Sequence, residues 1–150
     1  MAEHSKDIPD FDSEGVYVKF SDINGRGVFA KETFAMHEVL ETFPLTPCVF
    51  RTNYQGDPTV IHYSFINDAC HCEDCKKHGH VIYLSSGYGN MYNHQDAETC
   101  NARLEMNYKE LYGQVIATKT IKKDTEVTIY YGPTFNFPKG EVITHEDSPR

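Results

Sequence analysis

The chain has no tryptophan, no apolar stretch close to the length of a membrane span, and fewer basic than acidic residues. A transmembrane helix needs roughly 20 consecutive apolar residues, and residues 1–10 are polar and acidic, unlike a secretory signal. We therefore expect a soluble intracellular protein that does not enter a membrane. With 14 lysines and arginines against 22 aspartates and glutamates, the net charge is −8. That charge disfavours direct nucleic-acid binding and favours a basic protein or peptide as the partner.

The five cysteines, at positions 48, 70, 72, 75 and 100, are an odd number with three crowded together. This pattern argues against a secreted disulfide framework and for a reducing compartment. The segment 70–80 also holds three histidines, and the Cys-x2-Cys spacing within it suits one tetrahedral zinc ion. The predicted zinc ligands are Cys70, Cys72, Cys75 and His78, with His80 and Cys100 as alternatives. A solvated Cys/His-rich insertion that binds no metal has the same pattern.

The length of 150 residues, with 39% hydrophobic and 13% aromatic residues, indicates one globular domain. We expect residues 1–14 to form a flexible N-terminal tail and residues 15–137 to form the folded domain. The Cys/His-rich segment, at about 68–80, is read as an insertion within that domain. Residues 138–150, with proline, glycine and mixed charge, are expected to form a solvated tail.

Short runs of β-forming residues separated by turn residues dominate the chain. Val16–Phe20 and Val28–Ala30 flank the turn-rich segment 21–27, which predicts a hairpin with a glycine loop. Segments 59–65 and 90–93 are candidates for short helices. The class is therefore mainly β with little helix. The other predicted strands are Val39–Phe43, Cys48–Phe50, Val81–Leu84, Arg103–Met106, Tyr112–Ala117 and Val127–Tyr131.

Three separated blocks carry residues of the types that bind ligands or take part in catalysis. The first is Gly25-Arg26-Gly27-Val28-Phe29-Ala30, followed by Glu38-Val39-Leu40-Glu41. Glycines let the backbone approach a ligand closely, so this loop can hold the polar end of a cofactor. A Gly-x-Gly loop by itself is weak evidence, because most such loops are ordinary turns.

The second block is Gly87-Tyr88-Gly89-Asn90-Met91-Tyr92-Asn93-His94, with Asn101-Ala102-Arg103 further on. Buried amides and imidazoles need hydrogen-bond partners, and a polar cofactor is one economical partner. The third block is Glu126-Val127-Thr128-Ile129-Tyr130-Tyr131-Gly132, followed by Phe135 and Phe137. Alone, the third block is better explained by a core strand with an aromatic cap.

Together and in this order, the three blocks resemble the SET domain, a family of protein-lysine methyltransferases. The resemblance covers residues 16–137 and is closest to the minimal viral histone methyltransferases of the chlorella-virus type, which lack the pre-domain and the cysteine-rich post-domain. It implies several short curved sheets with a pseudoknot on the C-terminal side. It also implies transfer of a methyl group from S-adenosyl-L-methionine to a lysine of a basic protein such as a histone. A viral origin and a homodimer are consistent with this likeness.

The resemblance also implies roles for individual residues. Gly25, Arg26 and Gly27 would cradle the methionine part of the cofactor, and Phe135 or Phe137 would cover its adenine. Tyr131 matches the catalytic tyrosine of the family, to which we give an orienting role because a phenol with a pKa near ~10 is neutral at pH 7. The remaining implied residues are Tyr92, Asn93 and His94 for the cofactor, and Tyr63 as a wall of the lysine channel.

Three departures from the family pattern affect these expectations. Ile129 stands where many members have Phe or Tyr, so the number of methyl groups added is open. Gln95 replaces the usual serine of Asn-His-Ser, and residues 96–100 look like an insertion. A non-catalytic module that binds a basic peptide or the cofactor is therefore the alternative function.

An iron-dependent oxygenase is a third reading. His94-Gln95-Asp96 with the distant His145 fits the two-histidine, one-carboxylate iron site of these enzymes. His145 stands in a polar tail, however, and His-x-Asp triplets are common by chance. The expected compartment is the nucleus of a host cell if the substrate is a histone, and otherwise the cytoplasm.

Overall fold

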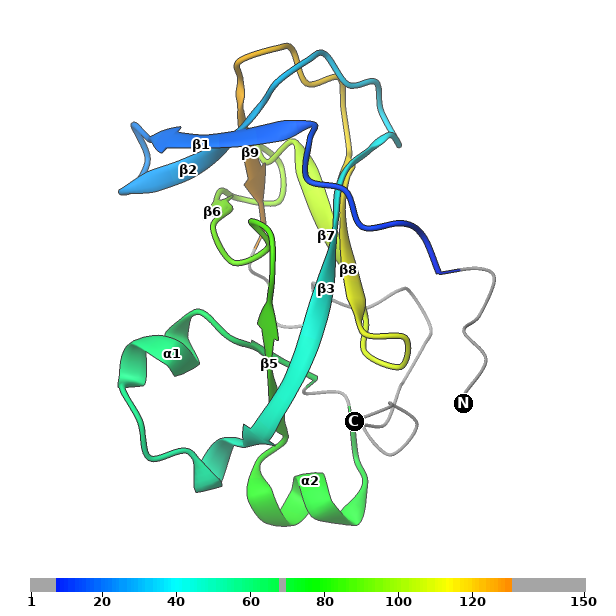
Figure 1. Cartoon of the computed structure of the whole chain (residues 1–150). Coiled ribbons are helices and arrows are strands. Elements are labelled where there is room, and N and C mark those ends of the chain that lie inside the picture. The colour runs from blue at the N-terminus through cyan, green and yellow to red at the C-terminus, as the bar shows by residue number, and fades with distance from the viewer. Residues whose placement is uncertain (1–7, 68–69, 131–150) are drawn as a thin grey trace.

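A computed structural model describes residues 8–67 and 70–130 of the chain (Figure 1). Within these residues the strands form two curled sheets, one in the order β1-β2-β9-β6 and the other in the order β4-β5-β3-β8-β7. The mainly β class expected from the sequence is confirmed. The elements are β1 Val16–Phe20, β2 Arg26–Ala30, β3 Val39–Phe50, the short 3-10 helix η1 Arg51–Asn53, α1 Pro58–His62, β4 Phe65–Ile66, α2 Glu73–His78, β5 Val81–Ser85, β6 Asn93–His94, β7 Ala102–Asn107, β8 Tyr112–Ala117 and β9 Glu126–Ile129.

The expected glycine-loop hairpin is present as β1 and β2, which pair antiparallel with Val18 opposite Val28. Its turn is closed by a hydrogen bond from the backbone N of Ser21 to the backbone O of Gly25, at 2.8 Å. Gly25 has a φ of 48°, in the left-handed region that glycine adopts without strain. The residues predicted to form strands and those predicted to form the turn therefore both do so in this hairpin.

Strand β3 runs unbroken over Val39–Phe50, where the sequence pattern predicted two separate strands. The pattern was misread because Pro44 and Pro47 cannot donate to a ladder and usually end strands. Here the first half of β3 pairs with β8 as far as Pro44, and the second half pairs with β5 from Leu45 onward. The proline thus stands where the strand changes partners, and the chain stays extended through it.

The helices are short. Helix α1 begins after Asp57, whose side chain accepts a hydrogen bond from the backbone N of Thr59 at 2.8 Å, and Pro58 occupies the first turn. It ends at His62, three residues before the predicted end. The predicted helix at 90–93 is wrong, because that segment is a turn leading into β6. Helix α2 was not predicted.

Strand β6 pairs in parallel with β9, with Asn93 opposite Thr128. Asn101 reinforces this pairing from the side: its Nδ2 donates to the backbone O of Glu126 at 2.8 Å, and its Oδ1 accepts from the backbone N of Thr128 at 2.9 Å. The second and third sequence blocks, more than twenty residues apart, are therefore joined directly.

The core lies between the two sheets and is built from aliphatic and aromatic side chains on both. Residue Asp12 also pairs with Thr42 of β3 through two backbone hydrogen bonds of 2.9 Å, so the expected tail of residues 1–14 meets the sheet there. No helix in the described part of the chain is long and apolar enough to cross a membrane. Core residues include Val16, Val28, Leu40, Phe43, Leu45, Tyr83, Leu104, Met106, Val115, Ile121, Val127 and Ile129.

Candidate functional site

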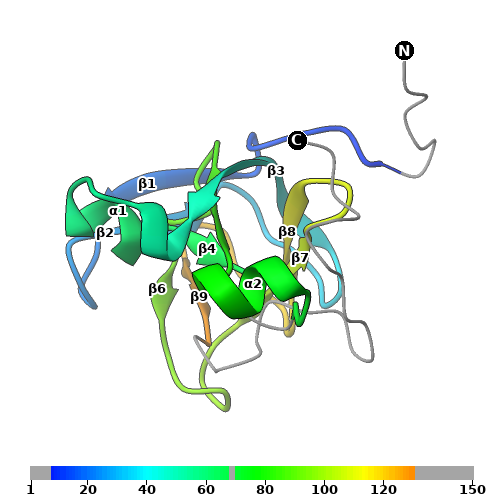
Figure 2. The same cartoon turned by 90° about the horizontal axis from the view of Figure 1, so that it is seen from below.

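A cavity of about 500 Å³ lies where the loop of the β1–β2 hairpin approaches the end of α1 and the turn before β6. Both views place the tip of the hairpin and α1 on the same side of the molecule (Figures 1 and 2). The first two sequence blocks thus line one cavity, and Tyr63 joins them from α1. The lining residues are Asn24, Gly25, Arg26, Tyr63, Asn90, Met91, Tyr92 and Asn93.

The side chain of Asn93 ties the hairpin loop to the rest of the site. Its Nδ2 lies 3.1 Å from Ser21 Oγ and 2.8 Å from Glu126 Oε2. It also lies 3.1 Å and 3.3 Å from the backbone oxygens of Asn24 and Arg26. An amide nitrogen carries two hydrogens to donate, whereas the amide oxygen can only accept. Because four acceptor atoms surround this position, the nitrogen end of the Asn93 amide faces the loop. The opposite atom, Asn93 Oδ1, accepts no hydrogen bond from any described residue.

Gly27 is required by the close approach of Glu126 and Asn93. A Cβ at this position would clash with Oε2 of Glu126 and lie 3.0 Å from Asn93 Nδ2. The other carboxylate oxygen of Glu126 accepts from Ser21 Oγ at 2.6 Å. Gly25 differs, because a Cβ there would meet nothing within 4 Å and only its positive φ favours glycine. The two glycines of the loop therefore serve different physical purposes.

Below the cavity, a buried carboxylate holds the second block in place. Glu41 is 1% exposed, and it accepts hydrogen bonds from Tyr92 Oη at 2.7 Å, from the backbone N of Tyr88 at 2.8 Å and from Ser13 Oγ at 2.6 Å. Burial, and then the neighbouring Glu41 carboxylate, raise the pKa of Tyr92 well above its usual value. The Tyr92 hydroxyl therefore stays protonated as a donor, and its ring forms part of the cavity wall.

Arg26, Tyr63 and His94 occupy different positions relative to the cavity. Arg26 is exposed, and its guanidinium lies over the ring of Phe20 at 5.9 Å from the centroid, which leaves a positive charge at the cavity rim. Tyr63 follows the last residue of α1 as its C-terminal cap and is 51% exposed. His94 lies outside the lining set, and its exposed ring packs against Tyr130 with 5.5 Å between centroids.

Three residues named from the sequence, Tyr131, Phe135 and Phe137, lie outside the described residues. Two residues to which sequence reasoning gave no role belong to the site. Glu126 was visible only as the acidic start of a predicted strand, and Glu41 only as an acid inside an apolar run. An acidic residue within an otherwise buried strand is the signal that could have identified both.

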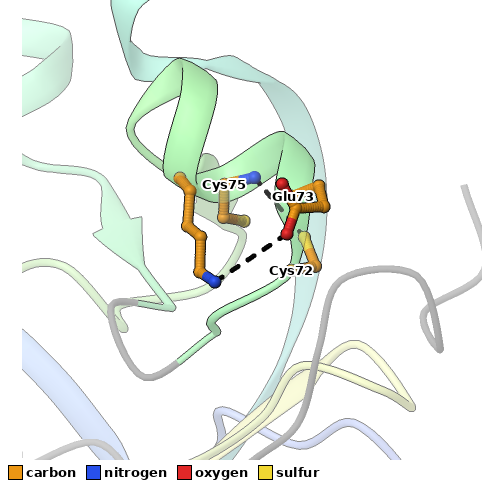
Figure 3. A network of polar contacts seen from close by, with 4 residues as sticks. Cys72, Glu73 and Cys75 are labelled. Atoms are coloured by element: carbon orange, nitrogen blue, oxygen red, sulfur yellow. Dashed lines mark hydrogen bonds and ion pairs between the residues drawn. The ribbon is translucent and has the colours of Figure 1, made fainter.

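Helix α2 lies at the far end of the molecule from the β1–β2 hairpin (Figure 1), and a second group of chemically active side chains belongs to this helix and the residues before it. The Sγ atoms of Cys70, Cys72 and Cys75 all lie within 4.8 Å of one another. Cys72 caps α2 by accepting a hydrogen bond from the backbone N of Cys75, at 3.4 Å (Figure 3). Burial and the adjacent cysteine sulfurs raise the pKa of Cys75. Without a metal, this thiol is therefore protonated at neutral pH.

His78, the predicted fourth ligand, is not part of this sulfur group. Its ring packs against Phe50, with 5.0 Å between centroids. The oxygenase reading gains no support from the geometry, because the three cysteines are the only metal-type group found among the described residues. His94 and Asp96 are both exposed, and His145 lies outside the described residues.

The comparisons with known proteins agree with this arrangement. No curated protein matches the chain by sequence. A Plasmodium falciparum protein described as a candidate histone methyltransferase is 26% identical, with a TM-score of 0.59 over 81% of this chain and 96% of that one. The methyltransferase domain of human PR domain-containing protein 2 is 13% identical, with a TM-score of 0.53 over 89% of this chain and 84% of that one.

A third similar structure is a humanized mutant of the Chaetomium thermophilum Polycomb Repressive Complex 2 bound to an inhibitor. It is 17% identical, with a TM-score of 0.58 over 83% of this chain and 16% of that one. At these identities the second and third likenesses show the fold alone. The SET domain profile matches residues 25–132, which begin at the first glycine of the hairpin loop and extend through all three blocks. The chain therefore belongs to the SET domain family.

Proposed function

We propose that this protein is a protein-lysine methyltransferase that uses S-adenosyl-L-methionine and acts on a basic protein segment such as a histone tail. The observation that carries the proposal is the single cavity lined by Gly25, Arg26, Tyr92 and Asn93, with Tyr63 at its wall. Membership of the SET domain family supports the reaction type. Similarity to a candidate histone methyltransferase at 26% identity supports the substrate class.

The residues of the cavity fit the charged end of this cofactor. S-adenosylmethionine carries an ammonium and a carboxylate on its methionine part. Asn93 Oδ1, which no described residue contacts, is an acceptor suited to the ammonium. The guanidinium of Arg26 at the rim is a donor suited to the carboxylate. The volume of about 500 Å³ lies within the roughly 300–1,000 Å³ of pockets that enclose ligands of this size.

The rigidity of the loop supports tight binding in one orientation. Asn93 Nδ2 donates to the backbone oxygens of Asn24 and Arg26 in the hairpin loop, and Ser21 and Glu126 hold Asn93 in place before any ligand arrives. A site whose polar groups are already oriented loses less conformational entropy on binding. The buried bond between Tyr92 and Glu41 fixes the opposite wall in the same way.

When bound, S-adenosylmethionine supplies a methyl group on a positively charged sulfur. The task of this chain is then to bring a neutral lysine amine into line with that methyl group. A free lysine has a pKa of about 10.4, and desolvation beside a cation lowers it. Tyr63 is proposed as an aromatic wall of the lysine channel, and Tyr131 is proposed to orient the methyl group through its hydroxyl.

The net charge of −8 supports a basic substrate, because a negative surface attracts lysine-rich and arginine-rich segments. Nuclear localisation follows from the proposal if the substrate is a histone. The likeness to viral members and the homodimer stay predictions. Sedimentation of the purified protein tests the homodimer.

Purified protein should be incubated with methyl-labelled S-adenosylmethionine and core histones, and the products analysed by mass spectrometry. We expect labelled lysines, and the same spectra report the site and the number of methyl groups. Cofactor binding measured by calorimetry without transfer to any basic protein or peptide would favour the non-catalytic module. Absence of both binding and transfer would refute the proposal. Dependence on iron and 2-oxoglutarate would indicate an oxygenase instead.

A further inference from the structure

We propose that Cys70, Cys72 and Cys75 bind a structural zinc ion that holds α2 against the end of the β3–β5 sheet. The site is remote from the cavity lined by the hairpin loop, and the proposal does not depend on the methyltransferase activity. It rests on the positions of three sulfur atoms, on their burial, and on the small apolar surface that α2 itself buries.

The sulfur positions suit one tetrahedral ion. With Zn–S bonds of about 2.3 Å, the sulfurs of a tetrahedral site lie about 3.8 Å apart. The three Sγ atoms here lie within 4.8 Å of one another, so closing around an ion needs shifts of about 1 Å at most. Cys70 and Cys75 are buried and Cys72 is partly buried. Thiolate-rich sites of this closed kind are typical of structural zinc.

Helix α2 buries little apolar surface of its own. A hydrogen bond from Thr52 Oγ1 to the backbone O of His78, at 2.8 Å, and the ring contact between Phe50 and His78 hold its C-terminal end. The helix spans six residues, Glu73–His78, of which only Cys75 is buried. Isolated helices shorter than about 12 residues are marginal in water and depend on packing of an apolar face. The one side chain that α2 buries is the thiol of Cys75. A single thiol buries too little apolar surface to fix a helix in place. A metal bound by this thiol and its two neighbours would anchor the N-terminal end of α2.

The length of the connection between β4 and β5 also supports a metal site. These strands pair antiparallel, with Phe65 opposite Tyr83, and antiparallel neighbours need only a short turn to join them. The chain instead makes a long excursion through residues 67–80, and all three sulfurs lie within it. A metal would close this loop at its base and reduce the conformational freedom of the unfolded chain.

One backbone contact holds a sulfur of this group in position. The backbone N of Cys75 donates to Cys72 Sγ at 3.4 Å (Figure 3), and a hydrogen bond to a charged sulfur stabilises that charge. The fourth position would be filled by water, because no histidine nitrogen of the described residues belongs to this group. Thiolate donors suit zinc rather than magnesium or calcium.

The first test is metal analysis of the full chain purified without added metal or chelator. We expect one zinc per chain by plasma mass spectrometry, and exchange with cobalt(II) should produce the intense visible absorption of a tetrahedral cobalt-thiolate centre. A metal-free protein that also fails to bind cobalt(II) or zinc(II) would overturn the proposal, and so would a disulfide between two of these cysteines detected by peptide mapping of the native protein.

Two serine variants locate the site. Cys72→Ser should weaken zinc binding at least tenfold and lower the melting temperature, whereas Cys48→Ser should change neither, because Cys48 is exposed and lies outside the sulfur group. Circular dichroism shows whether Cys72→Ser has folded. If it has not, the cobalt spectrum of the unmodified protein still tests the proposal. Equal zinc affinity in both variants would contradict the assignment.

Discussion

Asn93 Nδ2 lies 2.8 Å from Glu126 Oε2, across the parallel pair that β6 forms with β9. Glu126 also stands opposite Phe29 of β2, so its carboxylate lies where β2, β6 and β9 meet. Glu126, from the third sequence block, thereby holds Asn93, from the second block, in place. Asn93 in turn holds the hairpin loop of the first block through the backbone oxygens of Asn24 and Arg26. Cofactor affinity should therefore depend on residues that the cofactor need not touch.

Replacing Asn93 with alanine tests the acceptor assigned to the cofactor. The change removes Oδ1 and releases the loop from Nδ2, so the dissociation constant for S-adenosylmethionine should rise about tenfold or more, equivalent to about 1.4 kcal/mol. Calorimetric titration measures it. Asn53→Ala, at an exposed position in η1, is the matched control and should bind normally. Unchanged affinity in Asn93→Ala would remove this residue from the site.

The two glycines of the hairpin loop should respond differently to substitution. Gly27→Ala places a methyl group against the Glu126 carboxylate, so we expect a loss of about 1–3 kcal/mol in the free energy of unfolding. Gly25→Asn adds a side chain in open space at a positive φ that asparagine tolerates, so the loss should stay below about 1 kcal/mol. Urea denaturation compares the two variants, and equal losses would contradict the packing argument.

Tyr92→Phe should destabilise the fold by about 1.5–3 kcal/mol, because it removes a donor from the buried Glu41 carboxylate. The raised pKa of Tyr92 also has a consequence at high pH. The unfolded chain loses this proton near pH 10 while the folded chain keeps it, so the contribution of Tyr92 to stability is constant below about pH 10 and falls above it. Denaturation between neutral and alkaline pH should show a shallower fall in the variant. Identical slopes would mean that Tyr92 does not contribute.

Tyr131→Phe tests the orienting hydroxyl that the family resemblance assigns. If the hydroxyl positions the methyl group, kcat should fall at least ~100-fold, since small misplacements of reacting groups have effects of that size. Cofactor affinity and melting temperature should stay unchanged. Tyr130→Phe is the neighbouring control, because Tyr130 is 40% exposed and contacts His94 through its ring. A Tyr131→Phe enzyme with normal turnover would end the proposed role.

The strands were predictable where local chemistry and tertiary environment agree. Val16–Phe20 alternates β-forming residues before a turn rich in glycine and asparagine, and it forms the hairpin expected of it. The prediction failed at β3, because Pro44 normally ends a strand and only the change of partner there lets the strand continue. It also failed at α2, since six residues are too few to show a helical period.

The residues of the candidate site were named through the family resemblance, and their roles stay predictions. Gly25, Arg26, Tyr63, Tyr92 and Asn93 line one cavity, whereas Gly27 and His94 are not among its lining residues. No local pattern could have shown this, because Ser21 and Asn93 are separated by 72 positions in the sequence. The sequence also did not predict that Glu41 accepts hydrogen bonds from Tyr92 and Tyr88. The role of a buried acid can be recognised only when its hydrogen-bond donors are known.

The sequence by itself determined the acidic charge, the strand-rich class, the hairpin loop and the crowding of three cysteines, because each follows from composition or from neighbours along the chain. Only the tertiary structure decided that β6 pairs with β9, that Glu126 meets Asn93, and that Cys75 is the sole buried residue of α2. Such contacts join segments far apart in the chain, and they form only when the burial of the whole core makes them favourable together.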